Sequence, residues 1–204
     1  MAASRRSADR ALLRDRPAKS VAAKQAAVLS SDQLAALIRR ASPRDAALIA
    51  LMAAGAMRVG EATLLSWADV EDCTITLVGG TTKTCVGRSF TLPEQACKLL
   101  LQWRQQCPST KGRWVFPGLR GQPLSVRAAQ VAISKLAAQE GIKGVSSHSF
   151  RRSALTSAHE AGLSLKAVAE ISGHQSLAAL ERYLDQGVAK DKAEEARALL
   201  FASL

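Results

Sequence analysis

The chain has 204 residues, a formal net charge of +11 and a sequence pI of about 10.1. Hydrophobic residues make up 48% and aromatic residues 4% of it, which allows a sizeable core built from Leu, Ala, Val and Ile. The longest apolar stretch, residues 46–57, is too short to cross a bilayer, and the basic N-terminus lacks the apolar core of a signal peptide. We therefore expect a soluble cytoplasmic protein with no membrane partner.

The strong positive charge indicates a polyanionic partner. Nucleic acid is the first candidate and an anionic membrane surface the second, while a merely soluble basic protein is the plain alternative. The four cysteines, at positions 73, 85, 97 and 107, form no Cys-x-x-Cys pair, which argues against a zinc ribbon or a thioredoxin-like redox motif. We expect free, mostly structural thiols in a reducing compartment.

Residues 1–28 are expected to form a flexible basic arm, because they carry few large apolar residues. Basic residues outnumber acidic ones in this arm by seven to two: Arg5, Arg6, Arg10, Arg14, Arg16, Lys19 and Lys24 against Asp9 and Asp15. The ordered domain is predicted to cover residues 29–204. Its first helix is capped by Ser31 and Asp32.

A second helix is predicted over residues 43–54, with Pro43 at its first position and Gly55 in the left-handed conformation that often ends a helix. A short helix follows over residues 60–65. The alternating polar and apolar residues 74–78 predict a strand, the pair Gly79-Gly80 a turn, and residues 81–86 and 89–92 two further strands. These segments predict a small antiparallel sheet.

After Pro93 the pattern is helical again, apart from an extended stretch over residues 114–117. Ser125, Ser147 and Ser164 are expected to cap helices, and Gly141 and Gly162 to end two of them. The predicted helices cover 94–106, 125–140, 147–161, 164–171, 177–184 and a C-terminal helix, 190–202. The fold class is therefore α+β, mostly helical, with a small antiparallel three-stranded sheet at one edge.

Three segments carry residues suited to phosphate chemistry. Arg58 follows a glycine turn among apolar residues, and a half-buried arginine needs an anionic partner. Glu61 is one candidate partner, and a phosphate, whose oxygens match the guanidinium fork, is the other. His148 and Arg151 share a helix face at positions i and i+3. Tyr183 is the chain's one tyrosine.

The segments 55–70, 147–162 and 168–185 resemble, in order and spacing, the characteristic boxes of tyrosine recombinases, the family of phage integrases, chromosome-dimer resolvases and fimbrial invertases. The resemblance extends over residues 31–185. It implies a site-specific DNA recombinase that breaks and rejoins double-stranded DNA through a 3′-phosphotyrosyl intermediate. It also implies action on nucleoid DNA, commonly for a mobile element, by a monomer that assembles into a tetramer on paired sites.

The resemblance implies a role for each matching residue. Arg58 and Arg151 match the arginines that clamp the scissile phosphate, and Tyr183 matches the nucleophile. The remaining matches are His148 and His174 as the two histidines, Lys83 as the lysine of the β-hairpin, and Glu61 as the acidic residue that supports Arg58. No cofactor or metal is implied, because arginines and imidazoles can stabilise the charge that builds on the phosphate.

Two other functions remain open for the same residues. One is a DNA-relaxing or nicking transesterase with the chemistry of type IB topoisomerases, and the other is a catalytically silent DNA-binding accessory module. The family commonly carries an N-terminal helical domain that closes a clamp on DNA, and here only about 28 residues precede the first expected helix. The chain is therefore either a short member, as fimbrial invertases are, or a catalytic fragment.

Overall fold

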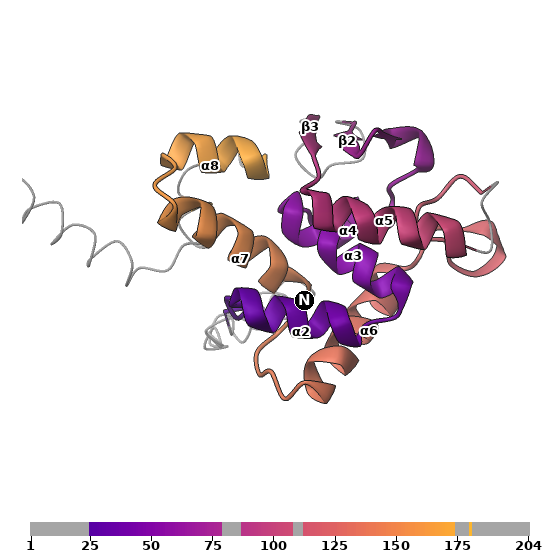
Figure 1. The fold of residues 1–204 in the computed structure, drawn as a ribbon, viewed down its shortest axis with the longest axis horizontal. Coiled ribbons are helices and arrows are strands. Elements are labelled where there is room, and N and C mark those ends of the chain that lie inside the picture. Colours follow the sequence, from indigo (N-terminus) through magenta and orange to yellow (C-terminus); the bar gives the residue numbers. More distant parts are fainter. Residues whose placement is uncertain (1–24, 79–86, 108–111, 174–179, 181–204) are drawn as a thin grey trace, which may run out of the picture.

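The computed structural model describes residues 25–78, 87–107, 112–173 and residue 180. In chain order the elements are helices α2 (Ser31–Arg40), α3 (Pro43–Ala54) and α4 (Val59–Thr63), the 3-10 turn η1 (Trp67–Asp69), strands β1 (Val70–Glu71), β2 (Thr74–Leu77) and β3 (Arg88–Thr91), helix α5 (Glu94–Gln106), the 3-10 turn η3 (Leu119–Gly121), and helices α6 (Val126–Gln139), α7 (Ser147–Glu160) and α8 (Leu165–Ser172). The predicted mostly helical α+β fold is confirmed (Figure 1).

Helix α3 is the centre of the core. Residues 46–52 are all buried, because α2, α4, α5, α6 and α7 pack around this helix. Its start is as predicted, since the Ser42 side chain accepts from the Asp45 amide and Pro43 occupies the first turn. The helix thus forms a rigid support from which the chain enters α4.

Two predicted helix starts shift by one or two residues, for reasons that the local hydrogen bonds explain. Ser30, not Ser31 or Asp32, caps α2, because its side chain and that of Gln33 exchange hydrogen bonds with each other's backbone amides. Ser146, not Ser147, caps α7. The caps predicted at Ser125 and Ser164 are confirmed.

The prediction of a left-handed Gly55 is wrong. Gly55 has φ −94°, and Ala56 takes the left-handed conformation instead, with φ 46°. Gly55 is needed for a different reason: a Cβ atom there would lie 2.1 Å from Cζ of Phe90. The glycine therefore lets the β3 strand approach the end of α3, which no local sequence rule reveals.

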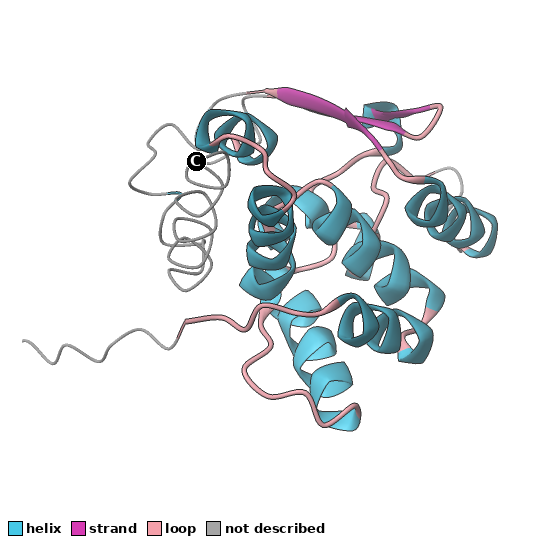
Figure 2. Ribbon diagram, turned by 60° about the vertical axis from the view of Figure 1, so that its left-hand side comes forward, coloured by secondary structure: helices cyan, strands magenta, loops and turns pink. Residues whose placement is uncertain are grey.

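The described sheet is antiparallel, with strand order β1-β2-β3, and lies along one edge of the helices (Figure 2). Ile75 pairs with Phe90, and Leu77 pairs with Arg88. The predicted three-stranded sheet is confirmed, but its composition differs, because β1 pairs with β2 across a tight turn at Asp72 and Cys73, both left-handed. The predicted strand 81–86 lies outside the described residues.

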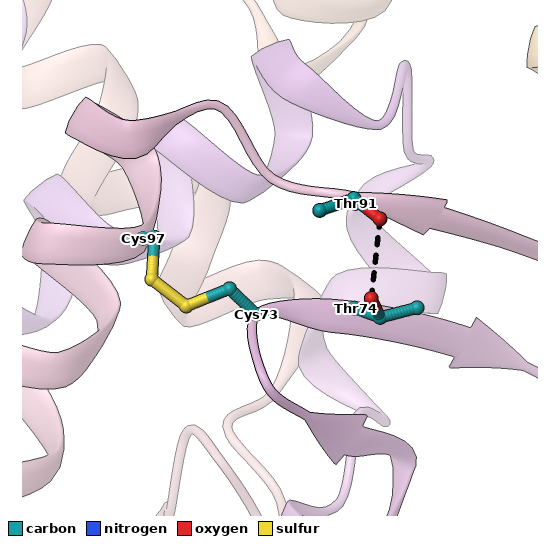
Figure 3. The surroundings of a disulfide bond; sticks show 4 residues. All are labelled: Cys73, Thr74, Thr91 and Cys97. Atoms are coloured by element: carbon teal, nitrogen blue, oxygen red, sulfur yellow. Dashed lines mark hydrogen bonds between the residues drawn. A yellow bond between two sulfur atoms is a disulfide. The ribbon is translucent and has the colours of Figure 1, made fainter.

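The expectation that all cysteines are free is wrong. Cys73, at the β1–β2 turn, is bonded to Cys97 of α5, with their Cα atoms 5.6 Å apart (Figure 3). Thr74 and Thr91, on the two adjoining strands, also share a hydrogen bond of 3.1 Å. The sequence could not reveal this pair because folding, not spacing, sets the Cα separation. Disulfides are rare in reducing compartments, so the bond does not support the cytoplasmic expectation.

The chain before α2 runs along α7. The Ser153 side chain accepts from the Leu29 amide at 2.7 Å, and Arg152 donates to the carbonyl of Ala26. Residues 1–24 and the predicted helices 177–184 and 190–202 lie outside the described residues, except for Leu180, which is helical and buried. In the described part of the chain, no helix has the length and apolarity needed to cross a membrane.

Candidate active site

The α3–α4 junction positions Arg58. The left-handed turn at Ala56 reverses the chain after α3, and Arg58 is the N-cap residue of α4, in an extended conformation. Its side chain is 21% exposed, so part of it reaches solvent. This position suits a residue that must contact a ligand from a fixed backbone.

Glu61 holds Arg58 by two contacts. One carboxylate oxygen accepts from the Arg58 amide at 3.0 Å, and the other accepts from its Nη1 atom at 2.8 Å. Glu61 is 4% exposed. Burial by itself would raise the pKa of Glu61, but the Arg58 amide and the side chains of Arg88 and Arg58 outweigh it and hold that pKa below its ordinary value of 4.5. The carboxylate is therefore a permanently charged support for Arg58 near neutral pH.

Arg151 lies beneath the junction, on α7, and is 1% exposed. Its Nη1 atom donates to the carbonyl of Ala56, and its Nη2 atom donates to the carbonyl of Ser172 at 2.7 Å. Ser172 ends α8, so one guanidinium joins the α3–α4 junction, α7 and α8. Because Ala56 lies two residues before Arg58, this contact also fixes the relative placement of the two arginine segments.

His148 lies in the first turn of α7, one turn before Arg151, and is exposed. Its amide donates to the Ser146 cap at 3.3 Å. The exposed imidazole and the buried guanidinium therefore belong to one helix, as the i, i+3 spacing predicts. The ring at the amino end of α7 is therefore open to a ligand from solvent.

The described residues thus contain Arg58, Glu61, His148 and Arg151 of the predicted site. The structure brings Arg58 and Glu61 into direct contact and joins Arg151 to the same junction. The predicted Lys83, His174 and Tyr183 lie outside the described residues. Gly173, which precedes His174, closes α8 in the left-handed conformation, next to the Ser172 carbonyl that Arg151 holds.

Sequence reasoning did not include Arg88 in the site. Its Nη2 atom donates to Glu61 at 2.9 Å, on the oxygen that also accepts from the Arg58 amide. A sequence signal was present, because Arg88 and Phe90 are two residues apart and so share one face of a strand, and the structure leaves both partly buried while Ser89 and Thr91 are exposed. A charge on an inward strand face needs a partner.

Within the described part of the chain, no three His, Cys, Asp or Glu side chains gather in a way that could hold a metal ion. The described side chains supply cationic hydrogen-bond donors at one helix junction, and an exposed imidazole in the first turn of α7. Such donors can stabilise an anion whose charge grows during a reaction, because they are already oriented before the reaction starts. The arrangement therefore suits phosphoryl chemistry on a polyanionic ligand.

The model of the phage integrase family matches residues 27–189, and the chain belongs to this family. It is similar to the tyrosine recombinase XerC of Xanthomonas axonopodis pv. citri (strain 306), with 31% identity over 142 residues that cover 69% of this chain and 46% of the relative. The XerC of Mycobacterium bovis (strain BCG / Pasteur 1173P2) is 30% identical over 200 residues, which cover 95% of this chain and 64% of the relative.

Among solved structures, the chain resembles the XerA recombinase, with a TM-score of 0.74 and 24% identity over 85% of this chain and 66% of that one. It also resembles the XerH recombinase bound to a palindromic difH substrate, with a TM-score of 0.67 and 22% identity over 81% and 51%. At these identities the likeness concerns the fold. The chain spans about half the length of the first curated relatives it matches.

Proposed function

We propose that this chain breaks and rejoins double-stranded DNA as a site-specific recombinase, or integrase, of the tyrosine type. The observation that carries the proposal is the pair Arg58 and Arg151, joined to one helix junction, with an exposed His148 one turn before Arg151 on α7, in a chain of the phage integrase family. The similar XerH structure holds its difH substrate, and a similar lambda integrase dimer holds a COC' core site. The proposed target is nucleoid DNA in the cytoplasm, a location that rests on the family and not on the Cys73–Cys97 bond.

The proposed reaction starts with attack of the Tyr183 phenol oxygen on the scissile phosphorus, which breaks the bond to the 5′ oxygen. The 3′ phosphate becomes linked to the tyrosine, and the free 5′ hydroxyl of another strand later reverses the step. Arg58, Arg151, His148 and His174 donate to the non-bridging oxygens as their charge grows. The phosphotyrosine ester that forms retains the energy of the phosphodiester bond that breaks, so rejoining needs no external energy source.

The phenol must lose its proton and the 5′ oxygen must gain one. A tyrosine with an ordinary pKa of about 10 is neutral at pH 7, so a histidine of the site accepts its proton during attack. Lys83 is the proposed acid for the leaving 5′ oxygen. Support for Tyr183 as the nucleophile comes from its place in the sequence three residues after Leu180, which belongs to the buried cluster that also contains Ala56 and residues of α7 and α8.

The nucleophile is tested with Tyr183→Phe on a nicked suicide substrate, from which the cleaved strand diffuses away. The unmodified chain should accumulate a covalent protein–DNA complex that survives denaturing electrophoresis, and Tyr183→Phe should form none while binding duplex DNA with unchanged affinity. Persistent covalent complexes would sink the assignment, since the chain has no second tyrosine. A plasmid with two sites then separates recombination, which gives deletion or inversion products, from relaxation, which gives topoisomers alone.

The acid is tested with Lys83→Ala on DNA that carries sulfur at the 5′ bridging position. Sulfur leaves without a proton, so the variant should cleave this strand almost normally while its cleavage of ordinary DNA falls by ~10²–10⁴-fold. Equal losses on both strands, together with weaker binding, would instead make Lys83 a lysine that contacts phosphate, and His174 would be the next candidate acid.

The basic arm is proposed to add sequence-independent contacts to the DNA backbone. Lysine and arginine contacts to phosphate release counterions, so affinity falls with salt in proportion to their number. Removing residues 1–24, which keeps the segment held by Ser153 and Arg152, should flatten the slope of log affinity against log salt. An unchanged slope would mean that the arm does not touch DNA.

The proposed assembly is a monomer in solution and a tetramer on paired sites. Residues 191–204 carry apolar side chains at helical spacing, which suits a tail that packs on a neighbouring subunit. A chain that ends at Asp185 should bind single sites but fail to assemble on paired sites in sedimentation analysis. Intact cooperative assembly of this shortened chain would place the tail on its own core instead.

A further inference from the structure

Arg88 is the first residue of β3, and its side chain is 8% exposed. It lies across the strand pair from Leu77 and points toward the end of α3, where its Nη2 atom donates to Glu61 at 2.9 Å and approaches the Gly55 carbonyl at 3.4 Å. Glu61 is therefore shared between two arginines. One of them, Arg58, is partly exposed to solvent and so to a ligand, and the other is not.

Two donors of Arg88, Nε and Nη1, are buried and have no hydrogen-bond partner among the described residues. A buried donor left unsatisfied is costly, at about 1–3 kcal/mol, so such a side chain persists only where the surrounding structure requires it. The same side chain lies against Gly173, where a Cβ atom would stand 3.3 Å from Nη1. Arg88 thus occupies the seam between the sheet, the α4 turn and the end of α8.

The charges in this seam explain why an arginine is needed. The Arg58 side chain contacts only one of the two Glu61 carboxylate oxygens. In the proposed function, the same guanidinium must also bind an anionic ligand. A second, buried cation on the other side keeps the carboxylate in place when a phosphate competes for Arg58. Arg88 fits this task, because it contacts the oxygen that accepts from the Arg58 backbone rather than from its side chain.

We propose that Arg88 is a positioning residue for DNA cleavage, which acts on the scissile phosphate through Glu61 and Arg58 and not by direct contact. The inference rests on the proposed recombinase function. Through Glu61, Arg88 connects the start of β3, the strand that follows Lys83 in the chain, to Arg58. A displacement of β3 would therefore displace Arg58. A misplacement of about 1 Å at a reacting group can cost 10²-fold in rate, which is the scale expected here.

The test is a double-mutant cycle on single-turnover cleavage of the suicide substrate at saturating DNA. Arg88→Met should slow cleavage by roughly 10–100-fold in the unmodified chain but by less than about 3-fold when Arg58 is already alanine, because groups that act through one another are not additive. Glu61→Gln should behave like Arg88→Met. Arg104→Met, which removes an exposed arginine stacked on Trp67, is the control for lost charge and should cleave at the normal rate.

Binding measurements distinguish a positioning role of Arg88 from a direct contact with phosphate. The affinity for duplex DNA and the slope of its salt dependence should be unchanged in Arg88→Met, whereas a direct phosphate contact would weaken binding and reduce the slope by about one. If Arg88→Met does not fold, the cycle is run with Arg88→Lys, which keeps charge and stem but offers no fork. Additive losses, or a reduced salt slope, would overturn the proposal.

The outcome is distinguishable from failure of the proposed function. If the unmodified chain forms no covalent complex on any candidate site, the recombinase proposal fails first. If it does form one, and Arg88→Met cleaves at the normal rate, only the positioning role is wrong.

Discussion

Arg58 and Arg151 occupy one site but are held by opposite means. Arg58 is paired with a carboxylate and is 21% exposed, whereas Arg151 is 1% exposed and is held by two backbone carbonyls. A carboxylate at the end of a side chain can shift with its rotamer, whereas the two carbonyls that accept from Arg151 belong to the backbone and are placed by the packed helices. The difference indicates that Arg58 is fixed by an adjustable side-chain support, and Arg151 by the fold itself.

The largest expected difference concerns the cost of losing each arginine. Arg151→Ala leaves two carbonyls without this donor and opens a buried space between three helices, so unfolding free energy should fall by about 3–5 kcal/mol. Arg58→Ala should cost only about 1 kcal/mol, because its backbone amide and Arg88 still satisfy Glu61. Urea denaturation measures both. Similar losses in the two variants would remove the distinction between the two supports.

The next effect concerns the sheet that supplies Arg88 to the Arg58 support. The Cys73–Cys97 bond closes a loop with a sequence separation of 24, which corresponds to about 3 kcal/mol of stability in the chain-entropy description. Cys73→Ser should lower the melting temperature under oxidising conditions. A reductant should lower the melting temperature of the unmodified chain but not that of Cys73→Ser. Cys107→Ser, at the buried free cysteine, is the control that leaves reductant sensitivity intact. A thiol titration that finds Cys73 free would contradict the bond.

A smaller effect is expected from the close approach of Gly55 to Phe90. Gly55→Ala drives a Cβ atom into the Phe90 ring and should cost about 1–3 kcal/mol, while slowing DNA cleavage through displacement of β3. Gly60→Ala is the matched control, because no atom lies within 4 Å of its added Cβ and alanine favours helix α4. A Gly55→Ala variant as stable as Gly60→Ala would mean that β3 is not seated as described.

The smallest effect is the acid dependence of stability. The pKa of Glu61 is lowered in the folded chain, so the unfolded chain binds its proton first as the pH falls. The stabilisation is fully present above about pH 4.5 and is lost as the pH falls through the lower folded value. Glu61→Gln should therefore flatten the pH dependence of unfolding free energy below pH 4.5. An unchanged profile would mean that the carboxylate is not held by the two arginines.

Much of the fold could be predicted from local patterns. The α5 range 94–106, the helix start at Pro43, the caps at Ser125 and Ser164, and the edge sheet all follow from short-range signals of periodicity and capping. The Glu61 partnership of Arg58 was one of two open alternatives, and the structure contains it. The Glu61 contact does not exclude a phosphate as a second partner, because the Arg58 side chain remains 21% exposed.

The remainder depends on contacts between residues far apart in the chain. The Ser172 and Ala56 carbonyls that hold Arg151 lie 21 and 95 positions away, and Arg88 reaches Glu61 across 27 positions. Gly55 is a glycine because of Phe90, and Cys73 is bonded because α5 packs beside the β1–β2 turn. Residue type indicates that such groups need partners, but it does not say which partners they have.

The sequence by itself therefore predicted most of the elements, because capping and periodicity act over a few neighbouring residues, and its resemblance to a family supplied the candidate site residues. Only the tertiary structure decided how the two arginines are held and that Arg88 supports one of them. The physical reason is that a buried guanidinium takes its partners from whatever carbonyls and carboxylates the packing brings within about 3 Å. That distance is set by three helices and a sheet, not by spacing along the chain.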